Sequence, residues 1–329
     1  MRDPSPSPKR RGRLLRFGAA SAVLLALAGY LSVQFLTGRT GGPGCEVVSG
    51  KEDGASYRFT PEQAVNAATI AAVGTGRGMP ERAVTIALAT ALQESALRNI
   101  DYGDRDSLGL FQQRPSQGWG TPEEIMDPSY SAGIFYDHLA KVPGYTRLPL
   151  TVAAQRVQRS GFPQAYAKHE PDATLLAAAL TGRSVATLTC QGRPGTTRIT
   201  GPDAVRSALV RDFGRDVVQE AGAEVGDGGP SPAPTPGLSA GSGAGERTVT
   251  LPVPAADTAA AGRSARQRGW QLAHWAVANA SALRIERVSY AGQEWTAGTT
   301  DDRWRAVATR GAAGAERDAG SVSITTTAR

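Results

Sequence analysis

Hydrophobic residues between positions 57 and 185 recur at helical spacing, and helix-start signals divide this region into segments. The stretch TPEQ at 60–63 combines a capping threonine, a proline at the first helical position and a glutamine three residues after the cap. The stretch TPEE at 121–124 repeats the pattern. No run alternates as a strand would, so we expect an all-α or nearly all-α domain. The predicted helices lie at 60–73, from 78–81 through residue 94, from 121–124 onward, at 128–139, at 151–159 and at 163–180.

The C-terminal part shows a mixed pattern. After a short predicted helix at 203–213, the next helical pattern spans 267–283 and contains two tryptophans. Polar and apolar residues then alternate over 284–298 around Ala291-Gly292, which predicts a hairpin, and 321–327 is expected to add a final strand. We therefore predict a small α+β module at 247–329.

An apolar segment without any charged side chain spans residues 17–38. About 20 apolar residues are enough to cross a bilayer as a helix, and basic residues flank such helices on the cytoplasmic side. We predict a basic cytoplasmic tail at 1–16 and a single transmembrane anchor at 17–38. A cleaved signal peptide is the alternative, because Ala26-Leu27-Ala28 has the small-residue form of a cleavage site. Both interpretations place the rest of the chain outside the cytoplasm.

Residues 222–246 are rich in proline, glycine, serine and alanine and contain few large apolar side chains. This composition is typical of a disordered linker, because such a segment cannot bury enough apolar surface to fold. The linker separates a predicted helical domain at 45–215 from the module at 247–329.

The net charge of +6 is concentrated in the N-terminal tail. Residues 1–16 contain six basic side chains and one acidic side chain, Asp3, so they account for a charge of +5. The remaining chain is close to neutral. A basic tail beside a membrane segment does not indicate a nucleic-acid-binding surface, and we predict no nucleic-acid partner.

The chain contains two cysteines, Cys45 and Cys190, which bracket the helical pattern at 57–185. In an exported protein they are expected to form a disulfide, and the alternative is a pair of unpaired buried thiols. Cysteines and histidines show no metal-ligand spacing, so we predict neither a metal nor another cofactor.

Glu94 stands late in a helix that is apolar on almost every side. At 100° per residue, Ala83, Ala87 and Thr90 fall on its face, so small side chains leave room beside the carboxyl. Burial raises the pKa of a carboxyl group, and a carboxylic acid that keeps its proton can protonate a leaving glycosidic oxygen. The alternative is a fraying last turn, in which Glu94 points into water or pairs with Arg98.

Two ordered motifs favour the first alternative. Glu94-Ser95, followed by the stretch GLFQ at 109–112, resembles the first two motifs of the lytic transglycosylases of the lysozyme-like superfamily. In that family a Glu-Ser pair ends a core helix and a Gly-Leu-Met-Gln segment follows. Phe111 replaces the usual methionine here. The resemblance covers roughly residues 57–185 and implies a lysozyme-like fold.

The resemblance assigns roles to three residues. Glu94 is expected to act first as general acid on the bond between N-acetylmuramic acid and N-acetylglucosamine. It then acts as base and draws the muramoyl 6-hydroxyl onto the anomeric carbon, which gives a 1,6-anhydro product. Ser95 and Gln112 are expected to orient substrate or the catalytic carboxyl. Their ordinary alternatives are a helix-end serine that bonds to backbone and a surface glutamine.

The third motif of the family, an Ala-Tyr-Asn segment, is not cleanly present. The stretches QRVQRSGF at 155–162 and QAYA at 164–167 are the candidates, and Tyr166 is either a substrate-binding residue or a structural tyrosine. A hydrolase of this fold needs a second carboxylate, and the loop after Glu94 offers three candidates. Their spacing does not fit the regular calcium loop, so a polar turn is the other interpretation. These three are Asp101, Asp104 and Asp106.

The stretch from His274 to Gly298 loosely resembles a small domain found beside cell-wall hydrolase domains, similar to zinc D,D-peptidases. No histidine follows His274, so the metal site of those enzymes is not expected here. We predict a binding or packing role for this module. Its tryptophans either form its core or contact sugar or peptide.

These features together lead to one main functional hypothesis and one alternative. We expect a single-pass membrane protein whose extracytoplasmic lysozyme-like domain cleaves the glycan strands of peptidoglycan. The alternative is a non-catalytic wall-binding or scaffold protein that keeps the fold without turnover. The expected partners are peptidoglycan strands and, through one helix, the cytoplasmic membrane.

Overall fold

The computed structural model describes most of the unit Pro43–Arg329. The predicted tail at 1–16, the anchor at 17–38 and the linker at 222–246 lie outside the described residues. Within those residues, no helix is both long enough and apolar enough to cross a membrane. The described ranges are 44–51, 53–161, 163–191, 201–215, 217, 247–253, 263–299, 303–307 and 320–327.

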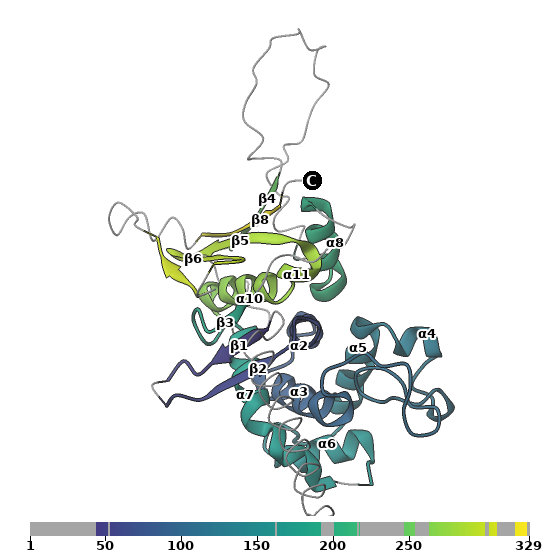
Figure 1. Ribbon diagram of the computed structural model, residues 1–329. Coiled ribbons are helices and arrows are strands. Elements are labelled where there is room, and N and C mark those ends of the chain that lie inside the picture. Colours follow the sequence, from purple (N-terminus) through teal and green to yellow (C-terminus); the bar gives the residue numbers. More distant parts are fainter. Residues whose placement is uncertain are drawn as a thin grey trace, which may run out of the picture. The chain divides into compact units, whose positions relative to one another are not determined.

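Helices dominate the first part of the described chain, as predicted (Figure 1). Both capping boxes are present, because the Thr60 side chain accepts from Gln63 and the Thr121 side chain accepts from Glu124. The helices are α2 (Pro61–Gly76), α3 (Glu81–Ser95), α4 (Pro122–Ile125), α5 (Pro128–Ala140), α6 (Leu150–Gln158), α7 (Glu170–Leu180) and α8 (Pro202–Phe213), with short 3-10 helices η1 (Pro115–Gln117) and η2 (Pro163–His169).

The single helix predicted at 163–180 is wrong in its first half. Residues Pro163–His169 form the 3-10 helix η2, and α7 begins only at Glu170. Pro171 explains the break, because a proline lacks the N–H needed inside an α-helix and clashes with the carbonyl four residues earlier. Proline is tolerated in the first turn, where it stands in α7.

A small antiparallel sheet that the sequence analysis missed joins the segment before α2 to the segment after α7. Its strand order is β2-β1-β3, with β1 at Cys45–Val48, β2 at Ser56–Phe59 and β3 at Leu188–Cys190. Cys45 and Cys190 lie opposite each other in the pairing of β1 with β3 and form the expected disulfide. The bond therefore connects the strand before α2 with the strand after α7.

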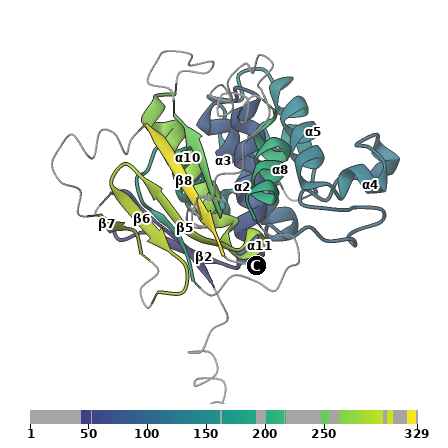
Figure 2. The same ribbon diagram turned by 90° about the horizontal axis from the view of Figure 1, so that it is seen from above.

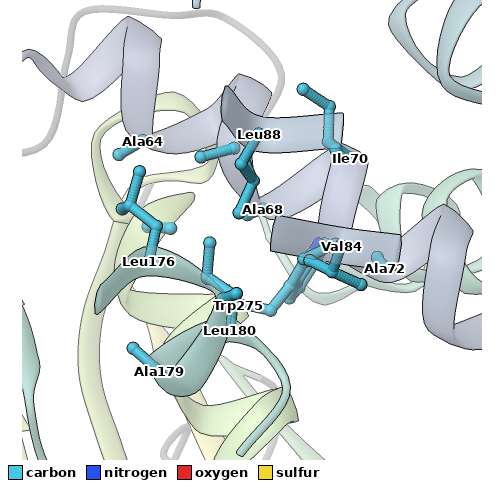
Figure 3. Packing of buried hydrophobic residues seen from close by; sticks show 14 of the residues in the cluster. Ala64, Ala68, Ile70, Ala72, Val84, Leu88, Leu176, Ala179, Leu180 and Trp275 are labelled. Carbon is cyan, nitrogen blue, oxygen red and sulfur yellow. The ribbon is translucent and has the colours of Figure 1, made fainter. Parts of the chain in front are cut away.

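Small side chains allow the core helices to approach closely. α2 and α3 are buried along most of their length. In Figure 3, alanines of α2 face aliphatic side chains of α3 and α7, and Trp275 comes from the C-terminal part. The labelled residues are Ala64, Ala68, Ile70, Ala72, Val84, Leu88, Leu176, Ala179, Leu180 and Trp275.

The C-terminal part contains the predicted hairpin and final strand, together with strands that were not predicted. The single helix predicted at 267–283 is divided at Asn279 into α10 and α11. α10 packs along one face of a five-stranded antiparallel sheet of order β4-β8-β5-β6-β7 (Figure 2). β4 and β7 are the strands that the sequence analysis missed. The elements are β4 (Thr248–Pro252), α10 (Ala265–Ala278), α11 (Ala280–Leu283), β5 (Ile285–Tyr290), β6 (Gln293–Thr296), β7 (Arg305–Ala306) and β8 (Ser321–Thr326).

The tryptophans of the C-terminal part belong to its core. Trp270, Trp275 and Trp295 are each 1% exposed, so none of them offers a ring to solvent. Trp304 is partly buried and donates its indole N–H to the Leu188 carbonyl at 2.9 Å. The packing interpretation is therefore confirmed for these residues.

A buried carboxylate connects α10 with the helical part of the chain. The side chain of Asp212, at the end of α8, is 0% exposed. It accepts hydrogen bonds from Trp275 Nε1 at 2.8 Å, from Thr69 Oγ1 at 3.2 Å and from Arg211 Nε at 2.8 Å. A buried charge is stable only when its lone pairs are satisfied, and these donors come from three different helices.

A buried histidine forms a second polar connection. His274 of α10 is fully buried, and its two ring nitrogens bond to the Ala179 carbonyl at 2.8 Å and to the Thr187 backbone N–H at 3.2 Å. A carbonyl needs a donor and an N–H needs an acceptor, so the neutral ring carries its proton on Nδ1. Burial lowers the pKa of His274 to about 4, against the opposing effect of the Ala179 bond.

His274 should make folding stability depend on pH. Its pKa is about 4 in the folded protein and 6.5 as the ordinary value, so between these values the unfolded chain binds more protons. Its contribution is fully present above pH 6.5 and declines as pH falls toward 4. The loss amounts to about 3 kcal/mol.

Urea unfolding of the wild type and of His274→Gln, at pH 7 and pH 4, measures this contribution. Glutamine keeps a donor and an acceptor but does not titrate, so the variant should lose about 3 kcal/mol less between the two pH values. Other titrating groups cancel in the difference. Identical pH dependence of the two proteins would show that His274 does not carry the effect.

Candidate active site around Glu94

The end of α3 is held in place by α2. Ala96 and Leu97 both adopt left-handed backbone conformations, with φ of 53° and 58°, and the Leu97 N–H bonds back to the Ala91 carbonyl at 3.1 Å. Gln63 and Asn66 of α2 donate their side-chain amides to the carbonyls of Ala96 and Leu97, each at 2.8 Å. The last turn, which carries Glu94, is therefore fixed, and the frayed alternative does not apply.

The Glu94 carboxyl bonds to a buried tyrosine. The Tyr166 hydroxyl donates to Glu94 Oε1 at 2.6 Å. Tyr166 is 0% exposed and comes from η2, whereas Glu94 itself is only partly buried. Arg98, the other partner considered, donates instead to the Ser95 carbonyl at 3.4 Å. Among the described residues, no ion pair joins Arg98 to Glu94.

Gln158, at the end of α6, is a second neighbour of Glu94 and one that the sequence analysis did not assign. Its side chain hydrogen-bonds to the Glu94 carboxyl, and its Nε2 also donates to the Phe111 carbonyl at 2.7 Å. Gln158 thus connects Glu94 with the GLFQ stretch. We use the name "Glu94 site" for Glu94, Tyr166 and Gln158.

Opposing influences set the protonation of Glu94. Burial raises the pKa of the carboxyl above its ordinary value of 4.5, and the hydrogen bonds from Tyr166 and Gln158 lower it. Burial has the largest effect, so the net direction is upward. The group can keep a proton at a higher pH than an exposed glutamate, while two donors are in place to stabilise its anion.

Ser95 connects α3 with the GLFQ stretch through its side chain. Its Oγ bonds to the Leu110 carbonyl at 2.8 Å and to the Ala91 carbonyl at 3.2 Å. Leu110 and Phe111 are fully buried, and Phe111 stacks on Phe135 with ring centroids 4.6 Å apart. Ser95 therefore fixes the position of this stretch, and its bonds go to backbone rather than to the Glu94 carboxyl.

Gln112 occupies a left-handed conformation at φ 47° and faces the loop that follows α3. Its Nε2 donates to the carbonyls of Tyr102 and Gly109, both at 3.3 Å. The structure thus brings together Glu94 and Tyr166 directly and holds Ser95 and Gln112 on the adjoining backbone.

The three aspartates of this loop differ in their surroundings. Asp106 bonds to Arg114 Nε at 2.8 Å and to the Ser116 backbone N–H at 2.8 Å. Bonds from the Ser116 side chain and Arg114 hold the pKa of Asp106 far below its ordinary value. Asp101 and Asp104 are exposed. The structure shows no hydrogen bond between Glu94 and any of the three.

The arrangement around Glu94 is suited to proton transfer. A partly accessible carboxyl with a raised pKa can give up a proton, and two fixed donors can then stabilise the anion. Among the described residues, no group of three or more histidine, cysteine, aspartate or glutamate side chains could hold a metal ion.

A comparison with family models gives a match in the C-terminal part. Residues 254–317 match the family model described as VldE, C-terminal domain. The matched range contains α10, α11 and the strands β5 to β7, and it leaves α3 and η2, which carry Glu94 and Tyr166, outside. No curated protein sequence matches the chain.

Proposed function

We propose that this protein is a membrane-anchored, lytic-transglycosylase-like enzyme that cleaves the glycan strands of peptidoglycan. The observation that carries the proposal is the 2.6 Å hydrogen bond from buried Tyr166 to a partly buried Glu94 whose pKa is raised. A carboxyl at the fixed end of a core helix has the properties of a general acid. We propose also that residues 45–215 form a lysozyme-like domain.

The proposed reaction uses one carboxyl group twice. Protonated Glu94 gives its proton to the oxygen that leaves N-acetylmuramic acid, and the glycosidic bond breaks. The resulting carboxylate, stabilised by Tyr166 and Gln158, takes the proton of the muramoyl 6-hydroxyl as that oxygen bonds to the anomeric carbon. Glu94 regains its proton and the product is a 1,6-anhydro sugar, so no water is consumed.

The location of the protein follows from the same proposal. We propose an anchor at 17–38 with a cytoplasmic N-terminus, which places the Glu94 site on the side where peptidoglycan lies. The disulfide between Cys45 and Cys190 supports this placement, because disulfides persist in oxidising compartments outside the cytoplasm.

Incubation of the purified full-length protein with peptidoglycan sacculi tests the function. Released fragments are identified by mass spectrometry, and anhydro-muropeptides are the expected products. Fragments with reducing ends would instead indicate hydrolysis with water as the acceptor. Binding to sacculi without any release would support the non-catalytic wall-binding protein and overturn the enzymatic proposal.

Tyr166→Phe should change the pH dependence of this activity. The phenol donates to the Glu94 carboxylate, so its removal destabilises the anion and raises the pKa of Glu94 further. A general acid must begin the cycle protonated, and its activity falls as pH rises through its pKa. The descending, basic limb of the pH–kcat/KM profile should therefore move to higher pH in the variant.

A second buried tyrosine provides the matched control. The Tyr136 hydroxyl donates to the Ile70 carbonyl at 3.0 Å, and Tyr136 is 1% exposed. Tyr136→Phe removes a buried hydroxyl of the same kind without touching Glu94, so it should lower stability and leave the profile in place. A basic limb that moves equally in both variants, or in neither, would contradict the role given to Tyr166.

A further inference from the structure

Tyr102 is the most exposed large hydrophobic residue among those described. It is 62% exposed, and the other residues of this kind are valines with exposures of 37–43%. Single exposed apolar side chains are common and need no explanation by themselves. Tyr102 differs because its backbone is firmly held, in the loop that follows α3 and its Glu94.

The GLFQ stretch holds the backbone at Tyr102. Gln112 Nε2 donates to the Tyr102 carbonyl at 3.3 Å. The next residue, Gly103, touches the same side chain so closely that an added Cβ would lie 1.9 Å from Gln112 Oε1 and 2.8 Å from the Ser107 carbonyl oxygen. Only glycine fits at this position without displacing its neighbours, so the loop and Gln112 are packed as one unit.

Further bonds close the loop on both sides of Tyr102. The Gly109 N–H donates to the Ile100 carbonyl at 2.7 Å, and Leu108 pairs with Gln113 as an isolated β-bridge. Asp106 is tied to Arg114 at 2.8 Å, as described above. These bonds fix the backbone that carries the Tyr102 ring. A ring held in a fixed position loses less conformational entropy when it binds a ligand.

The loop is connected to the Glu94 site through a short series of contacts. Gln112, which holds Tyr102, directly follows Phe111, whose carbonyl accepts from Gln158. Gln158 in turn bonds to Glu94. The Tyr102 backbone and the Glu94 carboxyl are thus connected through the Gln112 side chain, the Phe111 carbonyl and the Gln158 side chain of α6.

We propose that the ring of Tyr102 is a stacking surface for a sugar unit of the glycan strand whose neighbouring bond lies at Glu94. An aromatic ring offers an apolar face to the C–H groups of a pyranose, while the phenol at its rim stays in water. Tyrosine also gives large contact area at low conformational cost. This inference rests on the proposed function, because it names a subsite for the same substrate.

Binding measurements in an inactive background test the subsite without turnover. The full-length Glu94→Gln protein is titrated calorimetrically with soluble glycan strands, freed from sacculi by an amidase. Adding Tyr102→Ser should weaken binding about fivefold, whereas Tyr102→Phe, which keeps the ring, should bind as the parent does. Val185→Ser, at a 43% exposed valine, is the matched surface control and should change nothing.

Gly103→Ala tests, in a double mutant with Tyr102→Ser, whether the close contact between Gly103 and Gln112 holds the Tyr102 ring in place. Its Cβ must displace Gln112 or the backbone at Ser107, so this variant should weaken binding as Tyr102→Ser does. If glycine acts by placing the ring, the two substitutions together should be no worse than either alone. If the losses of binding free energy in the two single variants add fully in the double variant, the Gly103–Gln112 contact does not act through the Tyr102 ring.

The remaining outcomes separate this inference from the proposed function. If the Glu94→Gln parent binds the strands and Tyr102→Ser binds them equally well, the subsite is overturned and the enzymatic proposal stands. Equal losses in Tyr102→Phe and Tyr102→Ser would assign the effect to the hydroxyl and overturn stacking. If the parent does not bind glycan strands at all, both proposals fail.

Discussion

Glu94→Gln is expected to reduce the release of anhydro-muropeptides from sacculi by about a thousandfold, because general acid–base catalysis contributes about 10²–10⁴-fold and no other carboxyl of the described residues bonds to this site. Glutamine has nearly the same shape and its Oε1 can still accept from Tyr166, so folding should be preserved. The measurement is the initial rate of fragment release, with melting temperature recorded for each protein.

Glu62→Gln is the matched control for this substitution. Glu62 is an exposed glutamate in the first turn of α2, and its replacement removes one carboxylate without approaching the Glu94 site. It should retain the full rate of release. A Glu94→Gln protein that folds and releases fragments at the control rate would remove Glu94 from the mechanism.

Loss of the disulfide should give the largest change in stability. The bond joins Cys45 to Cys190 across a sequence separation of 145 residues. In the chain-entropy model, closure of a loop of this length stabilises the folded state by about 4–5 kcal/mol relative to the open chain. Cys45→Ala combined with Cys190→Ala should lower the free energy of unfolding in urea by about this amount.

Chemical reduction of the wild type provides an independent route to the same state. The chain has no other cysteines, so a reducing agent opens only this bond. The reduced wild type and the double alanine variant should unfold at similar urea concentrations, both below the oxidised protein. An unfolding free energy that changes by less than about 1 kcal/mol in both would contradict a constraint of this size.

Elements with local signals were predictable from sequence. The capping boxes at Thr60 and Thr121 mark helix starts because cap and acceptor lie three residues apart. The hairpin of β5 and β6 was marked by alternation and by the turn at Ala291-Gly292, both of which have positive φ. These features depend on residues close together in the sequence, so they can be predicted from one sequence alone.

Short elements carried too little signal. β1 and β2 have four residues each and β3 has three, so alternation cannot be distinguished from chance over their length. The split of 163–180 into η2 and α7 depends on Pro171. The spacing of hydrophobic residues does not show whether a proline stands in the first turn of a helix or in its interior. The cysteine pair was the single indication that the segment before α2 meets the segment after α7.

The candidate site was predictable in part. The apolar run around Glu94 indicated a buried helix end, and the Glu-Ser and GLFQ pair indicated which residues adjoin it. The hydrogen-bond partners of the Glu94 carboxyl were harder to predict from the sequence. Tyr166 lies 72 residues beyond Glu94 on a 3-10 helix without periodicity, and Gln158 looks like any polar residue of a surface helix. Such long-range pairs depend on tertiary packing, which local patterns do not contain.

The long-range polar contacts of α10 have the same origin. Three residues of the helix predicted at 267–283 each bond to the helical part of the chain. Gln271 bonds to Thr75, His274 to Ala179 and Trp275 to Asp212. The composition of residues 222–246 indicated a linker before α10. A linker does not predict any particular contact between α10 and the helical part.

Titration of the Glu94 carboxyl carbon by NMR tests the central claim most directly. Protein labelled with ¹³C-glutamate is followed across the pH range, and the Glu94 resonance is assigned from its absence in Glu94→Gln. We expect a midpoint clearly above 4.5, the ordinary value, because burial outweighs the bonds from Tyr166 and Gln158. A midpoint at or below 4.5 would mean that Glu94 is an ordinary ionised carboxylate at neutral pH and cannot be the proton donor.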